Sequence, residues 1–252
     1  MKGIILAGGT GSRLSPLTKV INKHLFPIGK FPMIYYPIAK MRECGINNVL
    51  IITGKNSADS LISLLGSGAE FQMEFSYRVQ EESGGIAHAL SLAEPFVGSE
   101  HSLVILGDNI FTDNLRECVT AFEKQPFGAK ILIKSVSDPE RYGVAEIKDG
   151  QIKSLEEKPK SPKTNYCVTG IYLYDNQVFE NIRKLQPSTR GELEITDVNK
   201  EYLQSSALTF DILNGWWIDA GTWEAIHEAN QYLWSKAGLA FGATVCHNLA
   251  IQ

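Results

Sequence analysis

Short apolar runs, each followed by a stretch with helical spacing, recur along the first half of the chain and most constrain its fold. The runs are Gly3–Ala7, Val49–Thr53 and Leu103–Leu106. Runs of this length, bounded by glycine, aspartate or threonine, are typical of parallel strands buried on both faces. The intervening helical stretches, Pro37–Cys44 and Ala58–Leu65, are each followed by a glycine suited to a left-handed C-cap. This alternation predicts β-α-β units and a parallel sheet.

The second half of the chain has a mixed pattern, in which strand segments follow one another more directly. Before it, apolar and polar residues alternate over residues 71–79, which predicts a strand with one buried face that leads to Gln80. A hairpin turn is indicated at Asp149-Gly150, and Thr222 is expected to be a helix N-cap. Further strands are expected over Lys130–Val136, Val144–Ile147, Ile152–Leu155 and Val168–Leu173, and helices over Asn176–Leu185, Leu193–Leu203 and Trp223–Lys236.

No Pro/Ser-rich linker separates these halves, and the sequence contains no internal repeat. Hydrophobic residues make up 44% of the chain and charged residues 21%, which is ordinary for a globular protein. We therefore predict a single α/β domain over residues 1–252, with a Rossmann-like three-layer α/β/α fold and a mixed, mostly parallel central sheet.

The charge and the cysteines exclude several classes of partner. With 24 basic and 28 acidic residues, the net charge of −4 gives no general attraction to nucleic acids or anionic membranes. Four cysteines without a CxxC pair indicate neither a zinc site nor a disulfide framework. No apolar run approaches the roughly 20 residues of a membrane span, and no signal peptide is indicated. We expect a cytoplasmic protein whose phosphate binding, if any, is local.

Three glycines and an arginine follow the first apolar run, at the point where a loop should leave the sheet. Glycine lets backbone N–H groups approach a ligand closely, and the Arg13 guanidinium adds a rigid fork of donors. Such a loop is suited to a polyphosphate. It consists of Gly8, Gly9, Thr10, Gly11, Ser12 and Arg13.

Two other phosphate motifs do not fit this loop. Leu14 stands where a dinucleotide-binding fingerprint needs a third small residue, and no Gly-Lys-Ser/Thr follows as a P-loop requires. The remaining alternative is a tight turn that needs glycine, with Arg13 as an ordinary surface charge.

Two aspartates are candidates for a metal site. Asp108 follows the run Leu103–Leu106, and the carboxyl ends of strands are where open α/β sheets build their sites. Asp219 follows an apolar segment rich in tryptophan. Two converging carboxylates suit Mg²⁺, which keeps waters and substrate phosphates as its other ligands. For Asp108 alone, capping of a turn or helix is an equally good interpretation.

The aromatic residues and histidines carry weaker signals. Packing is the expectation for each of the aromatic candidates, although any of them could stack on a base or a sugar. The five histidines show neither metal-ligand spacing nor a Ser or Cys partner, which argues against nucleophilic catalysis. The aromatic candidates are Tyr35, Tyr36, Trp216, Trp217 and Trp223.

Several short motifs follow one another along nearly the whole chain. They are Gly8–Leu14 with Lys23 and Pro27, Phe31–Pro37, Gly107–Asn109, Asp138–Val144, Glu156–Pro159, Val168–Gly170, Arg190–Asp197 and Trp217–Thr222. Each motif is weak alone, but together and in this order they resemble the sugar-1-phosphate nucleotidylyltransferase family. The resemblance implies the nucleotide-diphospho-sugar transferase type of fold, with a nucleotide-binding half over about 1–128 and a sugar-binding half over about 129–236.

The resemblance also implies roles for individual residues. Arg13, Lys23 and Lys158 are the expected catalytic residues, and Asp108 and Asp219 the expected Mg²⁺ ligands. Nucleotide binding is expected from Gly8, Gly9, Thr10, Gly11, Ser12, Arg13, Lys23, Gln80, Gly85 and Asp108. Sugar phosphate binding is expected from Asn109, Tyr142, Gly143, Glu157, Lys158 and Val168.

Plain structural roles are the alternatives for several of these residues. Glu157-Lys158 is also compatible with an exposed charge pair, Tyr142-Gly143 with a turn, and Val168 with core packing. Gln80 alone would be taken for a surface residue.

The implied reaction transfers a nucleotidyl group from dTTP to α-D-glucose 1-phosphate by Mg²⁺-assisted in-line attack, giving dTDP-glucose and pyrophosphate. The alternatives are the same chemistry with another triphosphate or sugar 1-phosphate, and a non-catalytic nucleotide-sugar sensor. A glycosyltransferase is disfavoured because no Asp-x-Asp motif lies beside an acceptor site. A homo-oligomer is expected. His24 stands where many dTTP-using members carry glutamine, which leaves the choice of base open.

The chain ends at Gln252, whereas longer family members carry a further helical region linked to allosteric regulation. The resemblance therefore implies a short, unregulated form. We expect dTDP-rhamnose to leave pyrophosphate release unchanged at concentrations that inhibit the long forms. Potent non-competitive inhibition in the same assay would contradict this expectation.

Overall fold

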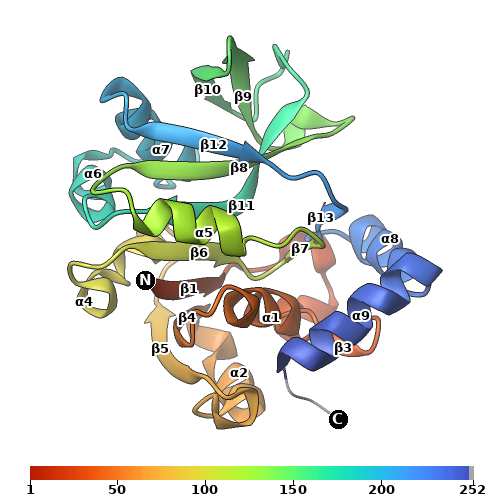
Figure 1. Cartoon of the computed structure of the whole chain (residues 1–252). Helices are drawn as coiled ribbons and strands as arrows, with labels where there is room; N and C mark the ends of the chain where they lie inside the picture. Colours follow the sequence, from red (N-terminus) through yellow and green to blue (C-terminus); the bar gives the residue numbers. More distant parts are fainter. Residues whose placement is uncertain (250–252) are drawn as a thin grey trace.

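A computed structural model describes residues 1–249, so the last three residues of the expected 1–252 domain lie outside the described residues. A nine-stranded mixed sheet forms the centre of the molecule (Figure 1). Its main path runs β5-β4-β1-β6-β11 and continues through β8 to β12. The strands are β1 (Lys2–Ala7), β2 (Pro27–Ile28), β3 (Phe31–Pro32), β4 (Asn48–Gly54), β5 (Glu74–Gln80), β6 (Ser102–Leu106), β7 (Asn109–Phe111), β8 (Ala129–Ser135), β9 (Gly143–Lys148), β10 (Gln151–Glu157), β11 (Tyr166–Tyr174), β12 (Leu208–Ile212) and β13 (Trp217–Asp219).

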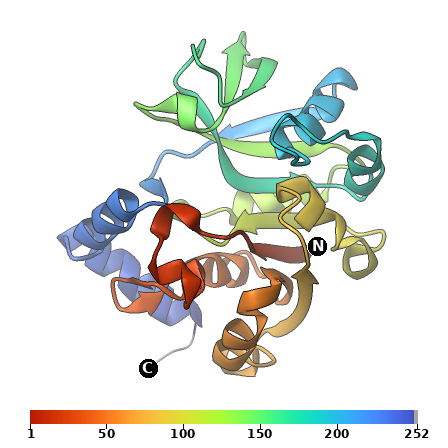
Figure 2. The ribbon, with the colours of Figure 1, turned by 180° about the vertical axis from the view of Figure 1, so that it is seen from behind.

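Helices cover both faces of the sheet, and none of those within residues 1–249 is long and apolar enough to cross a membrane. One face packs against α1, α2, α5, α8 and α9, and the other against α3, α4, α6 and α7 (Figures 1 and 2). The helices are α1 (Tyr35–Glu43), α2 (Ala58–Leu65), α3 (Ile86–Ser91), α4 (Glu94–Val97), α5 (Arg116–Glu123), α6 (Val178–Lys184), α7 (Ile195–Gln204), α8 (Trp223–Leu233) and α9 (Lys236–Leu249).

The central strands are apolar throughout because both of their faces are buried. In β1, Ile5 packs into the core under α1 while its neighbour Ile4 packs into the core on the opposite face. Strand β1 pairs in parallel with β4 and with β6, as the apolar runs predicted. The three-layer α/β/α fold with a mixed, mostly parallel sheet is thereby confirmed.

The sheet forks at β11, the strand that runs antiparallel to its neighbours. Residues Ile171–Tyr174 pair with β6, whereas Cys167 pairs with β9, so β9 and β10 diverge from the main sheet. Gly170 lies at the fork, and its N–H donates a hydrogen bond of 3.0 Å to Oδ1 of Asn109 on β7. The fork opens a space at the carboxyl end of β6, where Asp108 and Asn109 follow the strand.

Several of the element boundaries expected from the sequence are shifted by one to three residues in the structure. The strand expected over residues 71–79 begins only at Glu74, because Ala69–Phe71 forms a 3₁₀ turn before it. The helix expected from Leu193 begins at Ile195, because Glu194 is extended at the N-cap (φ −82°, ψ +133°) and the Leu193 carbonyl accepts a bond from Ala87 N instead. The final expected helix, Trp223–Lys236, ends earlier, as α8 at Leu233, and Lys236 begins the separate helix α9. Its predicted N-cap is confirmed, since Thr222 Oγ1 accepts a bond from Ala225 N at 3.2 Å.

A buried lysine holds the chain that follows β7. Lys40 on α1 is only 3% exposed, and its ammonium donates to the carbonyl oxygens of Thr112 and Asp113 at 3.3 and 2.8 Å. It also pairs with Glu43 at 2.8 Å. These partners lie beside the β7–β13 pair, so Lys40 supports the part of the fold that carries Asp108.

Replacing Lys40 with methionine keeps the apolar stem but removes the ammonium that donates to the Thr112 and Asp113 carbonyls and to Glu43. We expect Lys40→Met to lower the free energy of unfolding by about 2 kcal/mol, because buried acceptors lose their bonds. Urea denaturation measures this change. The exposed Lys124 provides the matched control, and equal midpoints for Lys40→Met and Lys124→Met would contradict the role given to Lys40.

Candidate functional site

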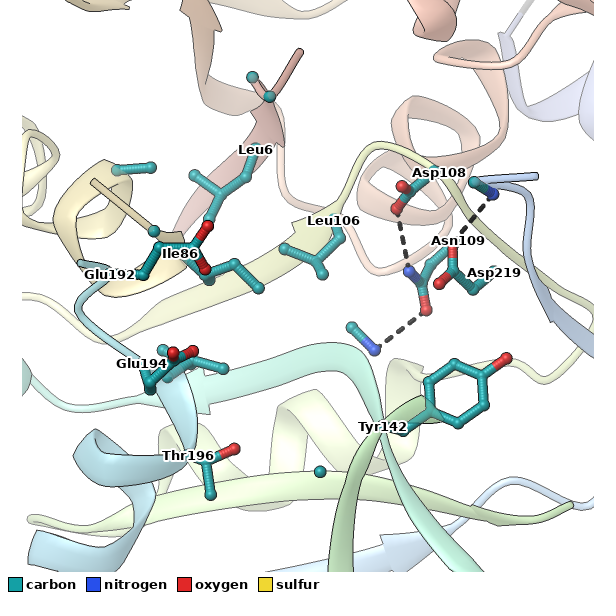
Figure 3. Close-up of a pocket in the computed structure, with 18 of the residues that line it drawn as sticks. Leu6, Ile86, Leu106, Asp108, Asn109, Tyr142, Glu192, Glu194, Thr196 and Asp219 are labelled. Carbon is teal, nitrogen blue, oxygen red and sulfur yellow. Dashed lines mark hydrogen bonds between the residues drawn. The ribbon is translucent and has the colours of Figure 1, made fainter. Parts of the chain in front are cut away.

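A cavity of about 590 Å³ lies where the carboxyl ends of β1 and β6 face the fork of the sheet. Every residue that the sequence singled out for nucleotide, sugar phosphate or metal binding borders it. Figure 3 shows Asp108, Asn109 and Asp219 on one side of this space and Glu194 and Thr196 on another. The structure thus brings the predicted residues together, while their individual roles remain predictions.

The glycine loop at the end of β1 adopts backbone conformations that favour glycine. Gly9 and Gly11 have φ of +88° and +58°. A Cβ on Gly11 would lie 2.8 Å from Thr18 Cγ2, and the Thr18 hydroxyl donates to the Gly11 carbonyl at 2.9 Å. The buried Leu14 anchors the far end of the loop. Strain and lack of space therefore both require glycine at position 11.

Lys23 projects into the cavity from a short 3₁₀ turn, Lys23–Leu25, whose N-cap is Asn22. Its ammonium pairs with the Asp108 carboxylate. The neighbouring His24 is 1% exposed, and its Nδ1 lies 2.7 Å from Asn22 Oδ1. Burial and the Lys23 charge lower the pKa of His24 to about 3, so the ring is neutral and structural. His24 does not line the cavity, so this difference from many dTTP-using family members lies outside the candidate site.

The pairing of β7 with β13 sets the two aspartates side by side. Asn109 and Asp219 are register partners in this antiparallel pair, and Ala220 N donates to the Asp108 carbonyl at 2.9 Å. Asp219 Oδ1 also accepts from Gly221 N at 3.0 Å. Residues more than 100 positions apart in the sequence are thereby held with both carboxylates on one cavity.

The two carboxylates differ in their electrostatic surroundings. Burial and the nearby Asp108 raise the pKa of Asp219 to about 6. Burial also opposes ionisation of Asp108, but the Lys23 ammonium holds the pKa of Asp108 well below its usual range. A buried and a half-buried carboxylate beside one paired lysine favour a further cation, and an all-oxygen donor pair fits Mg²⁺. No group of three or more His, Cys, Asp or Glu residues in the described part of the chain is placed to hold a metal, so substrate and water would supply its remaining ligands.

Asn109 holds together the strands that border the cavity. Its Oδ1 accepts from Gly170 N at 3.0 Å and from Trp217 Nε1 at 2.8 Å. Its Nδ2 donates to Asp108 Oδ1 at 3.2 Å, as Figure 3 shows. Asn109, expected to bind sugar phosphate, therefore has its main protein contacts within the scaffold.

The forked strands β9 and β10 supply the other side of the cavity. Glu157 at the end of β10 accepts a bond from Thr196 Oγ1 at 2.5 Å. Lys158 follows with φ of +45°, and its N–H donates to the Tyr142 carbonyl at 3.0 Å. The Lys158 ammonium lies 3.4 Å from Glu157 Oε1, so the charge pair exists but faces the cavity.

Several residues without a predicted binding role also line this cavity. Arg190 donates to Glu194 at 2.7 Å and to Glu157 at 3.3 Å, and it belongs to the loop before α7. The sequence signal for Arg190 is its place in the motif Arg190–Asp197, one of the segments that resemble the family. Trp217 was expected to pack, and it both packs against Tyr142 and borders the cavity. The other unassigned lining residues include Arg141, Tyr172, Glu192, Glu194 and Thr196.

Packing is confirmed for the remaining aromatic candidates. Trp216 stacks on Tyr232 with ring centroids 4.0 Å apart, and Trp223 stacks on Phe26 at 5.8 Å. Tyr36 is buried and its hydroxyl donates to the Ile28 carbonyl, while Tyr35 packs edge-on against Phe71 at 5.2 Å.

The loop after β5 is joined to the loop before α7 by backbone hydrogen bonds. Leu193 N donates to Gly84 O at 2.8 Å, and Ala87 N donates to Leu193 O at 3.2 Å. Gly85 between them has φ of +94°, and a Cβ there would lie 2.6 Å from the Leu193 carbonyl oxygen. Only glycine fits this close approach.

Comparisons with known sequences place residues 2–236 in the family described as nucleotidyl transferase. A glucose-1-phosphate thymidylyltransferase of Neisseria meningitidis is 42% identical over 241 residues, which are 92% of this chain and 82% of that protein. The low-salt glycan biosynthesis nucleotidyltransferase Agl11 of Haloferax volcanii is 38% identical over 254 residues, which cover 100% of this chain and 71% of that protein.

Solved structures show the same architecture. A Bacillus anthracis protein described as a glucose-1-phosphate thymidylyltransferase, solved with sucrose, is 57% identical with a TM-score of 0.89, covering 92% of this chain and 94% of that one. A UDP-glucose pyrophosphorylase solved with UDP-glucose is 26% identical with a TM-score of 0.82, covering 91% of this chain and 97% of that one.

Gly170 tests how the fork supports the site. A Cβ at this position would lie 2.5 Å from Asn109 Nδ2, so Gly170→Ala must displace the Asn109 side chain. We expect a drop of about 2 kcal/mol in the free energy of unfolding, because overpacking strains a close-packed core. Thermal denaturation of Gly54→Ala is the control, since Gly54 ends a strand of the same sheet with nothing within 4 Å of its Cβ position. Equal stability of the two variants would refute the role of the fork.

Proposed function

Because the chain belongs to the nucleotidyl transferase family, we propose that it transfers a thymidylyl group from dTTP to α-D-glucose 1-phosphate, giving dTDP-glucose and pyrophosphate. One observation carries this proposal. A phosphate-binding end, formed by Gly8–Arg13 and Lys23, and a sugar end, formed by Glu157-Lys158, open on one cavity with the carboxylates of Asp108 and Asp219. The names of relatives at about 40% identity supply the base and the sugar.

The reaction joins two phosphates without a protein base. A phosphate oxygen of the sugar 1-phosphate forms a new bond to the α-phosphorus of dTTP, and the bond from that phosphorus to the bridging oxygen breaks. Pyrophosphate leaves with the electron pair of the broken bond. A phosphate monoester has a second pKa of about 6, so the attacking oxygen is already ionised at neutral pH. Catalysis is then a matter of position and charge.

The cationic side chains of the cavity suit this division of labour. Arg13 and Lys23 bind the triphosphate and the departing pyrophosphate, while Lys158 binds the sugar phosphate. The backbone bond from Lys158 to Tyr142 fixes the turn that carries this lysine at the border of the cavity. Glu157 accepts hydrogen bonds from sugar hydroxyls, and the neighbouring Thr196 hydroxyl orients its carboxylate.

Asp108 and Asp219 are the residues that would hold Mg²⁺. When bound, the cation would neutralise phosphate oxygens that the two ionised carboxylates would otherwise repel. Asn109 and the Ala220–Asp108 backbone bond keep both carboxylates in place. The cytoplasmic location and the homo-oligomer stay predictions.

A pyrophosphate-release matrix tests the function. It combines dTTP, UTP, CTP, GTP and ATP with several sugar 1-phosphates, with Mg²⁺ and with excess chelator. We expect the highest kcat/KM for dTTP with glucose 1-phosphate, and loss of release in chelator. Substrate binding without release in any combination would indicate a sensor and overturn the proposal.

Asp108→Asn tests the metal assignment. The substitution removes one negative charge but keeps the shape, so we expect turnover to fall by about 100-fold or more with little change in the unfolding temperature. Asp149→Asn is the control, because Asp149 is exposed in the β9–β10 turn at φ +53°, a conformation that asparagine accepts. Near-normal pyrophosphate release from Asp108→Asn would exclude Asp108 as a required ligand.

A further inference from the structure

The side-chain amide of Gln80 has a defined orientation at the end of β5. One end of the amide lies 3.2 Å from the Gly85 carbonyl oxygen. A carbonyl oxygen can only accept a hydrogen bond, so this end of the amide must be the Nε2 donor. Gln80 is 8% exposed, and its chemical orientation follows from its surroundings.

His88 on α3 provides a second anchor for the same amide. Its Nδ1 lies 3.1 Å from Gln80 Nε2. Because Nε2 is a donor here, His88 Nδ1 must be the acceptor, and the imidazole is neutral with its proton on Nε2. Gly84 packs directly against this ring, since a Cβ on Gly84 would lie 2.4 Å from His88 Nδ1. The ring therefore occupies a restricted position.

The opposite end of the amide faces the candidate nucleotide site. Gln80 Oε1 lies beside Gly8, where an added Cβ would be 3.0 Å away, and Gln80 lines the cavity. Within residues 1–249 the Gln80 amide donates to Gly85 and His88, while no protein donor bonds to Oε1. Gln80 Oε1 is therefore available to accept a hydrogen bond from a ligand in the cavity.

We propose that His88 is a positioning residue for base selection: together with the Gly85 carbonyl it holds Gln80 with Oε1 toward the base, so that the site accepts an imide N–H and rejects cytosine. The inference rests on the proposed function, because it takes the base of the triphosphate to bind at Gln80, one of the residues expected to bind the nucleotide. His88 itself does not line the cavity and acts through Gln80.

The chemistry of pyrimidines explains the selection. Thymine and uracil carry a proton on N3, which can donate to Gln80 Oε1. Cytosine has a lone pair on N3, so two acceptors would face each other. Turning the amide to suit cytosine would place Oε1 against the Gly85 carbonyl oxygen and lose both Nε2 bonds. The free-energy cost of leaving these polar groups unpaired disfavours cytosine relative to thymine and uracil.

Two substitutions of His88 separate positioning from packing. His88→Gln keeps an acceptor that can bind Gln80 Nε2, whereas His88→Leu fills similar space without one. The substrates are dUTP and dCTP with glucose 1-phosphate, because these triphosphates share the same sugar and lack the thymine methyl group. The readouts are the ratio of kcat/KM for dUTP over dCTP, and the ratio of the two dissociation constants by calorimetry.

We expect wild type and His88→Gln to have similar ratios, and His88→Leu to lower the ratio by about tenfold or more, as expected for loss of one hydrogen bond to a neutral donor. A merely structural role would lower activity with both triphosphates and leave the ratio unchanged. An unchanged ratio in His88→Leu, by either readout, overturns the proposal.

The two proposals can fail separately. If wild type releases no pyrophosphate with any triphosphate, the proposed reaction fails, while the ratio of dissociation constants still decides the role of His88. If release is normal but His88→Leu discriminates as wild type does, only the role of His88 fails.

Discussion

The hydrogen-bonded pair of β7 and β13 is the constraint on which the rest of the site depends. It is short, but Asn109 joins it to the fork of the main sheet through Gly170 and Trp217. Because β6 leads directly into β7, the carboxyl end of the parallel sheet delivers Asp108 to the same point. One asparagine thus connects the antiparallel pair, the forked strand and a candidate metal ligand.

The charges of the site follow from this arrangement. The carboxylates of Asp108 and Asp219 are brought together at the cavity. Asp108 is paired with Lys23, and the pKa of Asp219 is raised to about 6. Removing a charge from water is costly, so two neighbouring carboxylates are typical of a site where a cation balances them or where they serve a function. The surrounding walls carry five basic side chains, which suit phosphates on both reactants, beside five acidic ones. The geometry and the electrostatics of the site are therefore both consistent with the proposed transfer between two phosphates.

The sequence predicted the central fold well, because both-face burial leaves a strong pattern in runs such as Gly3–Ala7. It also indicated the glycine loop, whose need for glycine at position 11 the structure explains. Other features depend on contacts that no local pattern records. The fit of Asn109 against Gly170 and the ion pairs of Arg190 arise from strand register and loop packing. Helix α9 was not predicted, since glycines interrupt its apolar residues.

The link between Gly84 and Leu193 has a consequence for how the protein fluctuates. Two backbone hydrogen bonds tie together loops that are separated by about a hundred residues. Opening either loop requires breaking both bonds, so the two walls share a single local unfolding free energy. Amide protons on both sides then exchange with solvent through the same opening event. The two loops therefore behave as one cooperative unit.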